Sequence, residues 1–137
     1  MKPPKAKTYA KPHLPGVLFL CREQGWSTYV EDAARTHRAL TAPGTTTLVA
    51  VIADDDVVGV VQIQGDGQIQ AHVSLVAVAG HFRRQGIGRE LVIEALRASG
   101  CVRADLVSED DESDAFYSRL PHRRGTGFRI YPPDDQG

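Results

Sequence analysis

Three β-branched runs follow one another in the middle of the chain, and this feature limits the fold most. The runs cover residues 46–53, 57–64 and 68–78, and only short polar or glycine-rich tripeptides separate them. Val, Ile and Thr favour strands, and such short connections are typical of hairpins. We therefore predict three consecutive antiparallel strands of one sheet.

The third run changes character along its length. Its predicted inward face is Ile69, Ala71, Val73, Leu75 and Ala77. Polar residues, including His72 and Ser74, occupy the alternate positions at first, but Val76 and Val78 make this second face apolar as well. We predict a strand that begins half-exposed and ends between two covering layers.

An amphipathic helix follows the third strand. Apolar residues recur at helical spacing between Gly86 and Ser99, and Gly100 can end the helix. Residues 102–107 then alternate as a further strand. Because a strand, a helix and a strand in this order form a right-handed crossover, the last strand should run parallel to the one ending at Val78.

The remaining elements have weaker patterns. Residues 1–12 contain three prolines and four lysines, and we expect a loose tail there with a short strand near residues 8–10. Helices are predicted for residues 14–24, 30–40 and 111–120, and a final strand for 126–131. With 137 residues, the chain is expected to form one α/β domain over residues 1–137, with a mixed sheet.

Composition excludes several classes of function. The 16 Lys and Arg against 17 Asp and Glu argue against a dedicated nucleic-acid binder. Cys21 and Cys101 form no C-x-x-C pair, so we expect free thiols and neither a zinc knuckle nor a thioredoxin-type site. No window approaches the ~20 apolar residues of a membrane span. The apolar run at 14–21 lacks a cleavage site, so we expect a cytoplasmic protein.

The segment between the third strand and the helix carries the chemistry. It reads Ala79-Gly80-His81-Phe82-Arg83-Arg84-Gln85-Gly86-Ile87-Gly88-Arg89. A helix start presents unpaired N–H groups and a positive dipole end, glycines allow close approach, and arginines add charge. We interpret it as a pyrophosphate cradle. No G-K-[ST] triplet makes a Walker A loop, and Leu91 stands where a Rossmann motif has its third glycine.

The pattern Arg83-x-x-Gly86-x-Gly88 resembles the Q/R-x-x-G-x-G/A motif of the GNAT superfamily of acetyl-CoA-dependent N-acetyltransferases. The strand before it, the helix after it and the later Ala115-Phe116-Tyr117 also fall where that superfamily has counterparts. The resemblance covers about residues 14–131. It implies a mixed, largely antiparallel sheet that is splayed in the middle and flanked by helices, with acetyl-CoA as cosubstrate and no metal.

The resemblance also implies where acetyl-CoA binds. The pantetheine arm would lie where the sheet splays, beside the strand ending at Val78, and the pyrophosphate would contact the basic loop. The implied cofactor-binding residues are Val76, Val78, Arg83, Arg84, Gln85, Gly86, Ile87, Gly88 and Arg89.

Tyr117 is implied as the general acid that protonates the departing thiolate, since a phenol can donate to a thiolate. The alternative is a core aromatic with a bonded hydroxyl. The superfamily pattern F/Y-Y-x-x-L-G-F has Pro121 in place of its glycine here, and Gly127-Phe128 offers a later match. This departure puts the helix exit and the neighbouring acceptor site in doubt.

The general base stays open. His72 lies on the polar face of the third strand and has a suitable unperturbed pKa, and Ser74 on that face could position a water. Glu23, Glu31 and Asp32 or ordered water are the alternatives. Candidate walls of an acceptor pocket are Trp26 and Tyr29.

We expect an enzyme that moves an acetyl group from acetyl-CoA to the primary amine of a small molecule, by direct attack in a ternary complex. One alternative is a non-catalytic acyl-CoA-binding or protein-interaction module with the same fold. A nucleic-acid adaptor that uses the basic residues at 119–124 is the other. Because members of the superfamily are often dimers, a homodimer is also expected, without nucleic-acid or membrane partners.

Overall fold

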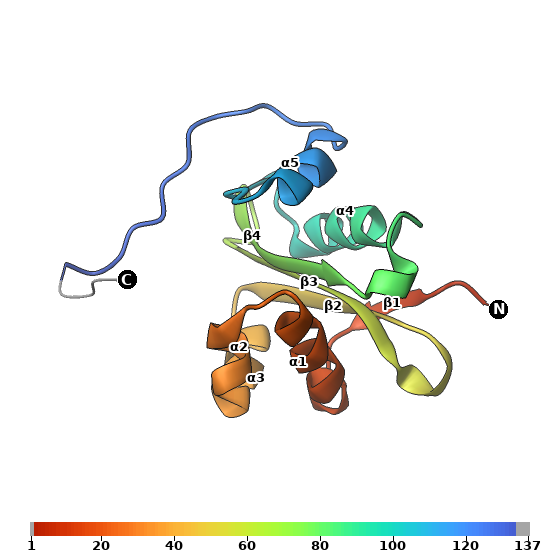
Figure 1. Cartoon of the computed structure of the whole chain (residues 1–137). Helices are drawn as coiled ribbons and strands as arrows, with labels where there is room; N and C mark the ends of the chain where they lie inside the picture. The colour runs from red at the N-terminus through yellow and green to blue at the C-terminus, as the bar shows by residue number, and fades with distance from the viewer. Residues whose placement is uncertain (1, 134–137) are drawn as a thin grey trace. The chain divides into compact units, whose positions relative to one another are not determined.

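The computed structural model of the chain describes residues 2–133, with a five-stranded sheet in the larger of two compact units (Figure 1). In order across the sheet, its strands are β1 (Lys5–Thr8), β2 (Thr45–Val51), β3 (Val57–Gly65), β4 (Gln70–Val78) and β5 (Arg103–Asp105). β1 to β4 are antiparallel neighbours, whereas β5 runs parallel to β4. The predicted hairpins, the crossover and the mixed, largely antiparallel sheet are confirmed.

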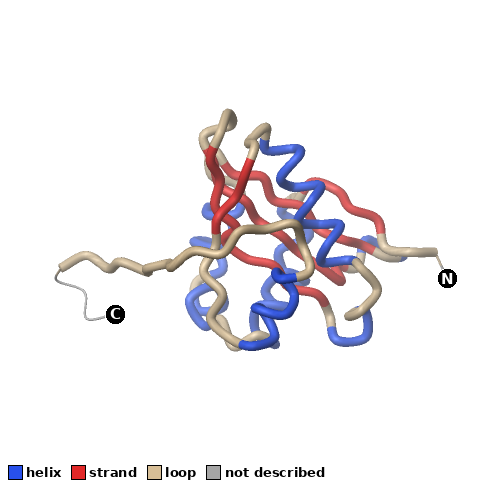
Figure 2. Tube along the Cα trace, turned by 90° about the horizontal axis from the view of Figure 1, so that it is seen from above, coloured by secondary structure: helices blue, strands red, loops and turns tan. Residues whose placement is uncertain are grey.

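The two units are Met1–Asp105 and Leu106–Gly137. In the first, helices cover both faces of the sheet (Figures 1 and 2). One face carries α1 (Leu14–Glu23), α2 (Ser27–Glu31) and α3 (Ala33–Leu40), and the other carries α4 (Ile87–Ser99). Within residues 2–133, no helix has the length and apolar character needed to cross a bilayer.

Each face of the sheet buries its own apolar side chains. On the side of α1, Leu20 packs with Val60 and Leu75. On the side of α4, a Cβ at Gly59 would stand 3.1 Å from Leu91, so glycine lets the helix approach β3 closely. Burial of one such leucine or valine contributes roughly 1.5–3 kcal/mol. This packing holds α4, and the loop that leads into it, against the sheet.

β4 contains one extra residue relative to β3. Val73 pairs with Ile63, but the next pair along the strands is Leu75 with Gln62, which leaves Ser74 without an opposite residue. An insertion of this kind is a β-bulge, and it changes the direction of the groups that follow.

The bulge corrects the single inward face predicted for this strand. Gly59 and Gly65 lie on the same face of β3, the face that packs against α4. Ala71 pairs with Gly65 and therefore lies on the α4 side of β4. Leu75 belongs instead to the core on the α1 side. The predicted alternation has the right period, but the strand presents opposite faces before and after Ser74.

Several predicted boundaries also differ. The helix predicted over 30–40 is interrupted at Asp32, whose extended backbone (φ −139°) and carboxylate, which accepts from the Arg35 N–H at 3.0 Å, cap α3. The strand predicted over 102–107 is only Arg103–Asp105. Of the tail predicted over 1–12, residue 1 lies outside the described residues, and the short strand predicted near residues 8–10 lies at Lys5–Thr8, where it pairs with β2.

The second unit is built around α5 (Asp111–Ser118). Asp110 caps this helix by accepting from the Ser113 N–H at 2.7 Å, and Arg124 makes a two-pronged ion pair with Asp114 at 2.9 and 3.2 Å. The strand predicted over 126–131 is wrong. Within the described residues this segment has no strand partner, and Ile130 is 88% exposed (Figure 2).

A buried polar group fastens the N-terminal segment to the β2–β3 turn. His13 is 3% exposed; its Nδ1 accepts from the Ala10 N–H at 3.0 Å and its Nε2 lies 2.7 Å from an Asp55 carboxylate oxygen. Because Nδ1 is an acceptor, the ring proton is on Nε2, which donates to Asp55. Lys7 donates to the other oxygen of Asp55 at 3.1 Å.

We predict that Asp55→Ala lowers the melting temperature by several degrees relative to Asp54→Ala, a neighbour with the same φ of 61°. Hydrogen bonds from Lys7 and His13 lower the pKa of Asp55. The stabilisation is therefore present above the pKa of the unfolded carboxyl and is lost as the pH falls below it, so calorimetry should find the difference shrinking toward about pH 3. Equal melting temperatures at pH 7 would contradict this role.

Candidate active site

β4 has a neighbour on its outer side along only part of its length. β5 pairs with Gln70, Ala71 and His72, and the last pair is His72 with Asp105. From Val73 to Val78, no strand of the described chain pairs with β4 on this side. The strand pairing thus ends where the sequence analysis expected the sheet to splay.

The bulge decides which backbone groups of β4 face this open side. The Ile69 carbonyl accepts from the Val102 N–H at 3.0 Å and so points toward β5, whereas the Ala79 N–H donates to the Val58 carbonyl of β3 at 2.8 Å. Backbone groups alternate between the two sides of a strand. Val76 and Val78 are therefore the residues that direct their N–H and C=O groups to the open side beyond the bulge.

Arg83 also reaches this edge. Its Nε donates to the Val78 carbonyl at 3.2 Å, so the first arginine of the predicted cradle lies against the end of β4. A carbonyl oxygen has two lone pairs and can accept a second bond. The structure thus brings together two predicted sites, the backbone of β4 and the basic loop.

The loop that leads into α4 has a strained, open backbone. Arg84 has a φ of 64° and Gly86 a φ of 82°, both in the left-handed region. α4 begins at Ile87, directly after Gly86, and no side chain from residues 2–133 caps it. Alternating left-handed residues before a helix start turn successive N–H groups to one concave side, where they bind anions.

The surroundings of this loop suit a phosphate ligand. Arg83, Arg84, Gln85 and Arg89 are exposed, whereas Ile87 and Gly88 are buried. Among the described residues, apart from Gly86 and its chain neighbours, no atom lies within 4 Å of the place a Gly86 Cβ would take, so a ligand can approach the backbone there. An uncapped helix end, exposed arginines and open space over the glycine together fit the diphosphate of CoA.

A row of polar side chains lies on the α1 side of the sheet at the bulge. His72 pairs with Gln64, and the Gln64 side-chain amide donates to the Ser74 hydroxyl. Both His72 and Gln64 are exposed. His72 is the last residue of β4 that pairs with β5, one position before the open edge begins and two positions before Ser74. Its role as the general base stays a prediction.

The other acceptor-site candidates lie on the helices of this face. Glu23, Glu31 and Asp32 are exposed. Trp26 and Tyr29 are partly buried against the core, with ring centroids 6.2 Å apart and planes tilted by 53°. These rings therefore contribute to the packing of α1 and α2 against the core, and each keeps part of its surface exposed.

Tyr117 lies in the second unit, on α5. Its ring makes an edge-to-face contact with Phe116, with centroids 4.8 Å apart. Burial raises the pKa of the Tyr117 phenol to about 12. The phenol thus keeps its proton at neutral pH, which a general acid requires.

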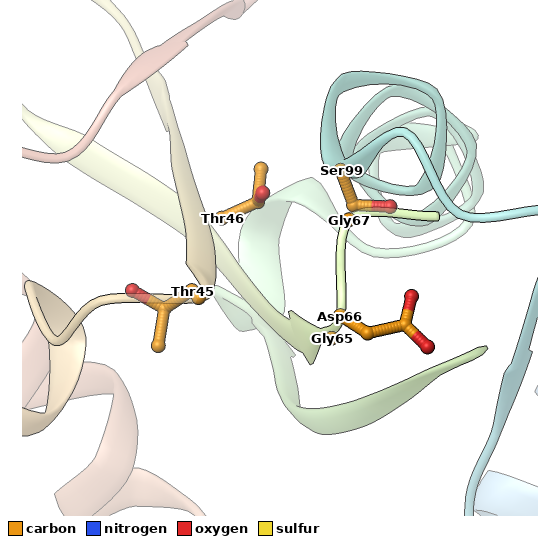
Figure 3. Close-up of a pocket in the computed structure, with 7 residues that line it drawn as sticks. Thr45, Thr46, Gly65, Asp66, Gly67 and Ser99 are labelled. Carbon is orange, nitrogen blue, oxygen red and sulfur yellow. The ribbon is translucent and has the colours of Figure 1, made fainter. Parts of the chain in front are cut away.

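A hollow of about 230 Å³ opens elsewhere in the first unit (Figure 3). It is lined by Gly44, Thr45, Thr46, Gly65, Asp66, Gly67 and Ser99. Ser99 ends α4, about 18 Å along the helix from its start. The polar side chains that line the hollow make hydrogen bonds within the fold. Thr45 donates to the Ala42 carbonyl at 2.6 Å, and Asp66 accepts from the N–H groups of Gln68 and Ile69 at 2.7 Å each.

Sequence reasoning missed two parts of the site. The bulge at Ser74 and the bond from Gln64 to Ser74 depend on the pairing of β4 with β3, which residue types alone do not reveal. The left-handed backbone of Arg84 was also missed, because arginine carries no preference for that region.

Solved structures with the same fold are known. An acetyltransferase of the GNAT family from Streptococcus pneumoniae TIGR4 is 25% identical, with 96% of this chain and 98% of that chain covered and a TM-score of 0.73. The aminoglycoside N-acetyltransferase AAC(6')-Iy in complex with CoA is 19% identical, with coverage of 96% and 95% and a TM-score of 0.76. An aminoglycoside acetyltransferase from an uncultured soil metagenomic sample, in complex with sisomicin, is 18% identical, with coverage of 94% and 95% and a TM-score of 0.71.

A comparison with curated protein sequences finds no match. The model of the acetyltransferase (GNAT) family matches residues 15–120, which include β2 to β5 of the sheet, the basic loop and α5. With most of its length matched and with the open edge of β4 beside an uncapped helix start, this chain belongs to the GNAT acetyltransferase family.

Proposed function

We propose that this protein transfers the acetyl group of acetyl-CoA to the primary amine of a small molecule, by direct attack in a ternary complex. The observation that carries the proposal is the open edge of β4, with Val76 and Val78 directed toward it, next to the uncapped start of α4. A pantetheine arm carries amides that can pair with a strand edge, and a diphosphate suits a helix start. Acetyl-CoA carries both groups and would use both features.

When bound, acetyl-CoA supplies an activated acetyl group as a thioester. The backbone of Val76 and Val78 would pair with the pantetheine amides, and the N–H groups from Arg84 to Gly88 would bind the diphosphate. Arg83, Arg84 and Arg89 would add positive charge. Catalysis would come mainly from holding the amine and the acetyl carbon in contact.

The transfer needs one proton to leave the amine nitrogen and one proton to reach the departing thiolate. The amine nitrogen forms a bond to the acetyl carbon, the carbon–sulfur bond breaks with its electron pair going to sulfur, the nitrogen loses a proton and the thiolate gains one. We assign the first proton to His72, directly or through water, because it lies on the polar face beside the bulge. Tyr117 is the proposed donor of the second.

Burial acts on Tyr117 in two ways. It keeps the phenol protonated, with a pKa of about 12, but it also makes the phenol a weaker acid than a free tyrosine. The same exclusion of water would raise the pKa of a thiolate next to it, because burial disfavours both anions. Proton transfer in such surroundings stays feasible, and the phenol would act only once the thiolate has formed.

We propose a cationic amine as the acceptor. The exposed carboxylates of Glu23 and Glu31 at the ends of α1 and α2, and of Asp32 between α2 and α3, would attract a cation. Structures with the same fold include aminoglycoside acetyltransferases, one in complex with sisomicin. Both cysteines are free, which suits the reducing cytoplasm as the place of action.

A non-catalytic acyl-CoA-binding module is the alternative, favoured by the replacement of the motif glycine with Pro121. Release of CoA thiol from acetyl-CoA in the presence of an aminoglycoside, a polyamine, an amino acid or a peptide separates the two. An enzyme releases thiol in proportion to one of these amines, and a binding module releases none. The nucleic-acid adaptor is disfavoured, since Arg124 of the basic patch is paired with Asp114.

We predict that Gly86→Ala weakens CoA binding roughly tenfold, as expected for the loss of about one hydrogen bond near a new Cβ. Gly25→Ala is the matched control, since Gly25 has a φ of 77° and equally open surroundings. Each variant should lose about 1–2 kcal/mol of unfolding free energy, because an L-residue is strained there. Titration calorimetry measures the affinity and urea unfolding the stability. Equal CoA affinity in both variants would refute the cradle.

We predict that Tyr117→Phe lowers kcat and leaves CoA affinity unchanged, because the hydroxyl would act on the leaving thiolate only. With a pKa of about 12, Tyr117 should cause no alkaline decline of kcat up to about pH 10. Tyr131→Phe, which changes an exposed tyrosine of the same unit, should leave kcat unchanged. Equal turnover of Tyr117→Phe and wild type across the pH range would remove Tyr117 from the mechanism.

A further inference from the structure

The extra residue of β4 has a hydroxyl with a defined hydrogen-bond partner. Ser74 has no opposite residue on β3, and it lies two positions beyond His72, the last residue of β4 that pairs with β5. Its side chain is half-buried. Ser74 therefore stands at the point where β4 loses its outer neighbour.

Gln64 determines what the Ser74 hydroxyl can do. The side-chain amide of Gln64 donates to the Ser74 oxygen, so the hydroxyl is an acceptor in this contact. A serine hydroxyl has one proton of its own, and a bond accepted at oxygen leaves that proton for another acceptor. The Gln64 contact thus holds the oxygen and leaves its O–H proton available to an acceptor other than Gln64.

We propose that the Ser74 hydroxyl is a catalytic residue that donates a hydrogen bond to the thioester carbonyl oxygen, and that Gln64 positions it. This assignment rests on the proposed function, which lays the thioester along the open edge of β4. Negative charge builds on that oxygen as the amine nitrogen attacks the acetyl carbon, before the carbon–sulfur bond breaks. A donor already aimed at this position stabilises the transition state without reorganisation.

The bulge gives a reason for a side-chain donor at this point. Backbone N–H groups of a regular strand reach its outer edge at every second residue, and the insertion of Ser74 interrupts that spacing. The hydroxyl can supply a donor at the interruption. Val76 then supplies the next backbone N–H toward the open side.

The test compares kcat, both KM values and CoA affinity among five variants. Ser74→Ala should lower kcat roughly 100-fold, the typical effect of removing one such donor, with KM values and CoA affinity unchanged. Ser74→Thr keeps a hydroxyl and should retain most of the activity. Gln64→Glu replaces the donating amide with an acceptor, which should capture the Ser74 proton and lower kcat as well.

The double variant Ser74→Ala with Gln64→Glu separates a positioning role of Gln64 from a general charge effect. If Gln64 acts through the hydroxyl, the double variant should be no slower than Ser74→Ala alone. Gln68→Glu adds the same charge in the β3–β4 turn and should be as active as the wild type. Additive losses in the double variant would overturn the role of Gln64.

Two other outcomes are decisive. In the first, the wild-type protein binds CoA and acetylates an amine, but Ser74→Ala is equally active or is altered only in KM. This result would overturn the assignment of Ser74 and leave the proposed function intact. Wild-type protein that binds no CoA by calorimetry would overturn the proposed function and this assignment with it. A melting temperature of Ser74→Ala equal to that of the wild type shows that the loss of kcat is not a loss of fold.

Discussion

The single-residue insertion at Ser74 is the constraint on which the rest of the site depends. The Ile69 carbonyl points toward β5. Without the insertion, the odd-numbered residues would direct their backbone N–H and C=O groups to this side along the whole of β4. With it, Val76 and Val78 face the open side, and Leu75 enters the core on the α1 side. One inserted residue thus sets the ligand-facing backbone and the packing of the strand together.

The loop before α4 depends on packing at a distance from it. Left-handed backbone at Arg84 is unfavourable for a residue with a Cβ, so its neighbours must hold it. Leu91, one turn into α4, packs against the glycine of β3 at position 59, and Arg83 bonds to the end of β4. These contacts hold the backbone on both sides of Arg84 against the sheet.

The spacing of apolar residues and the positions of glycine and other turn residues predicted most of the fold. Burial of one face of a strand or helix imposes this spacing on the sequence. The three hairpin strands, α4 and the crossover to β5 could all be predicted in this way. The bulge could not, because apolar and polar residues keep alternating through Ser74 and only the register with β3 reveals the insertion. The strand predicted over 126–131 is absent for a related reason. Alternating polar and apolar residues make a segment suitable for a strand, but a strand forms only where a neighbouring strand supplies hydrogen bonds. The position of the basic loop between β4 and α4 could be predicted because glycine and arginine residues mark it in the sequence, whereas the contact of Gln64 with Ser74 could not.

The short length of β5 argues for a ligand at this edge. Leu106 and Val107, which follow it, are apolar residues suited to extend the strand, yet the pairing with β4 stops at Asp105. Each further pair would satisfy backbone groups of β4, and one hydrogen bond contributes about 0.5–1.5 kcal/mol. A fold selected for stability alone would gain by closing this edge. Under the proposed function, an edge left open beside an uncapped helix start would gain its hydrogen bonds from a bound molecule instead, and a molecule with amides at one end and a diphosphate at the other would satisfy both.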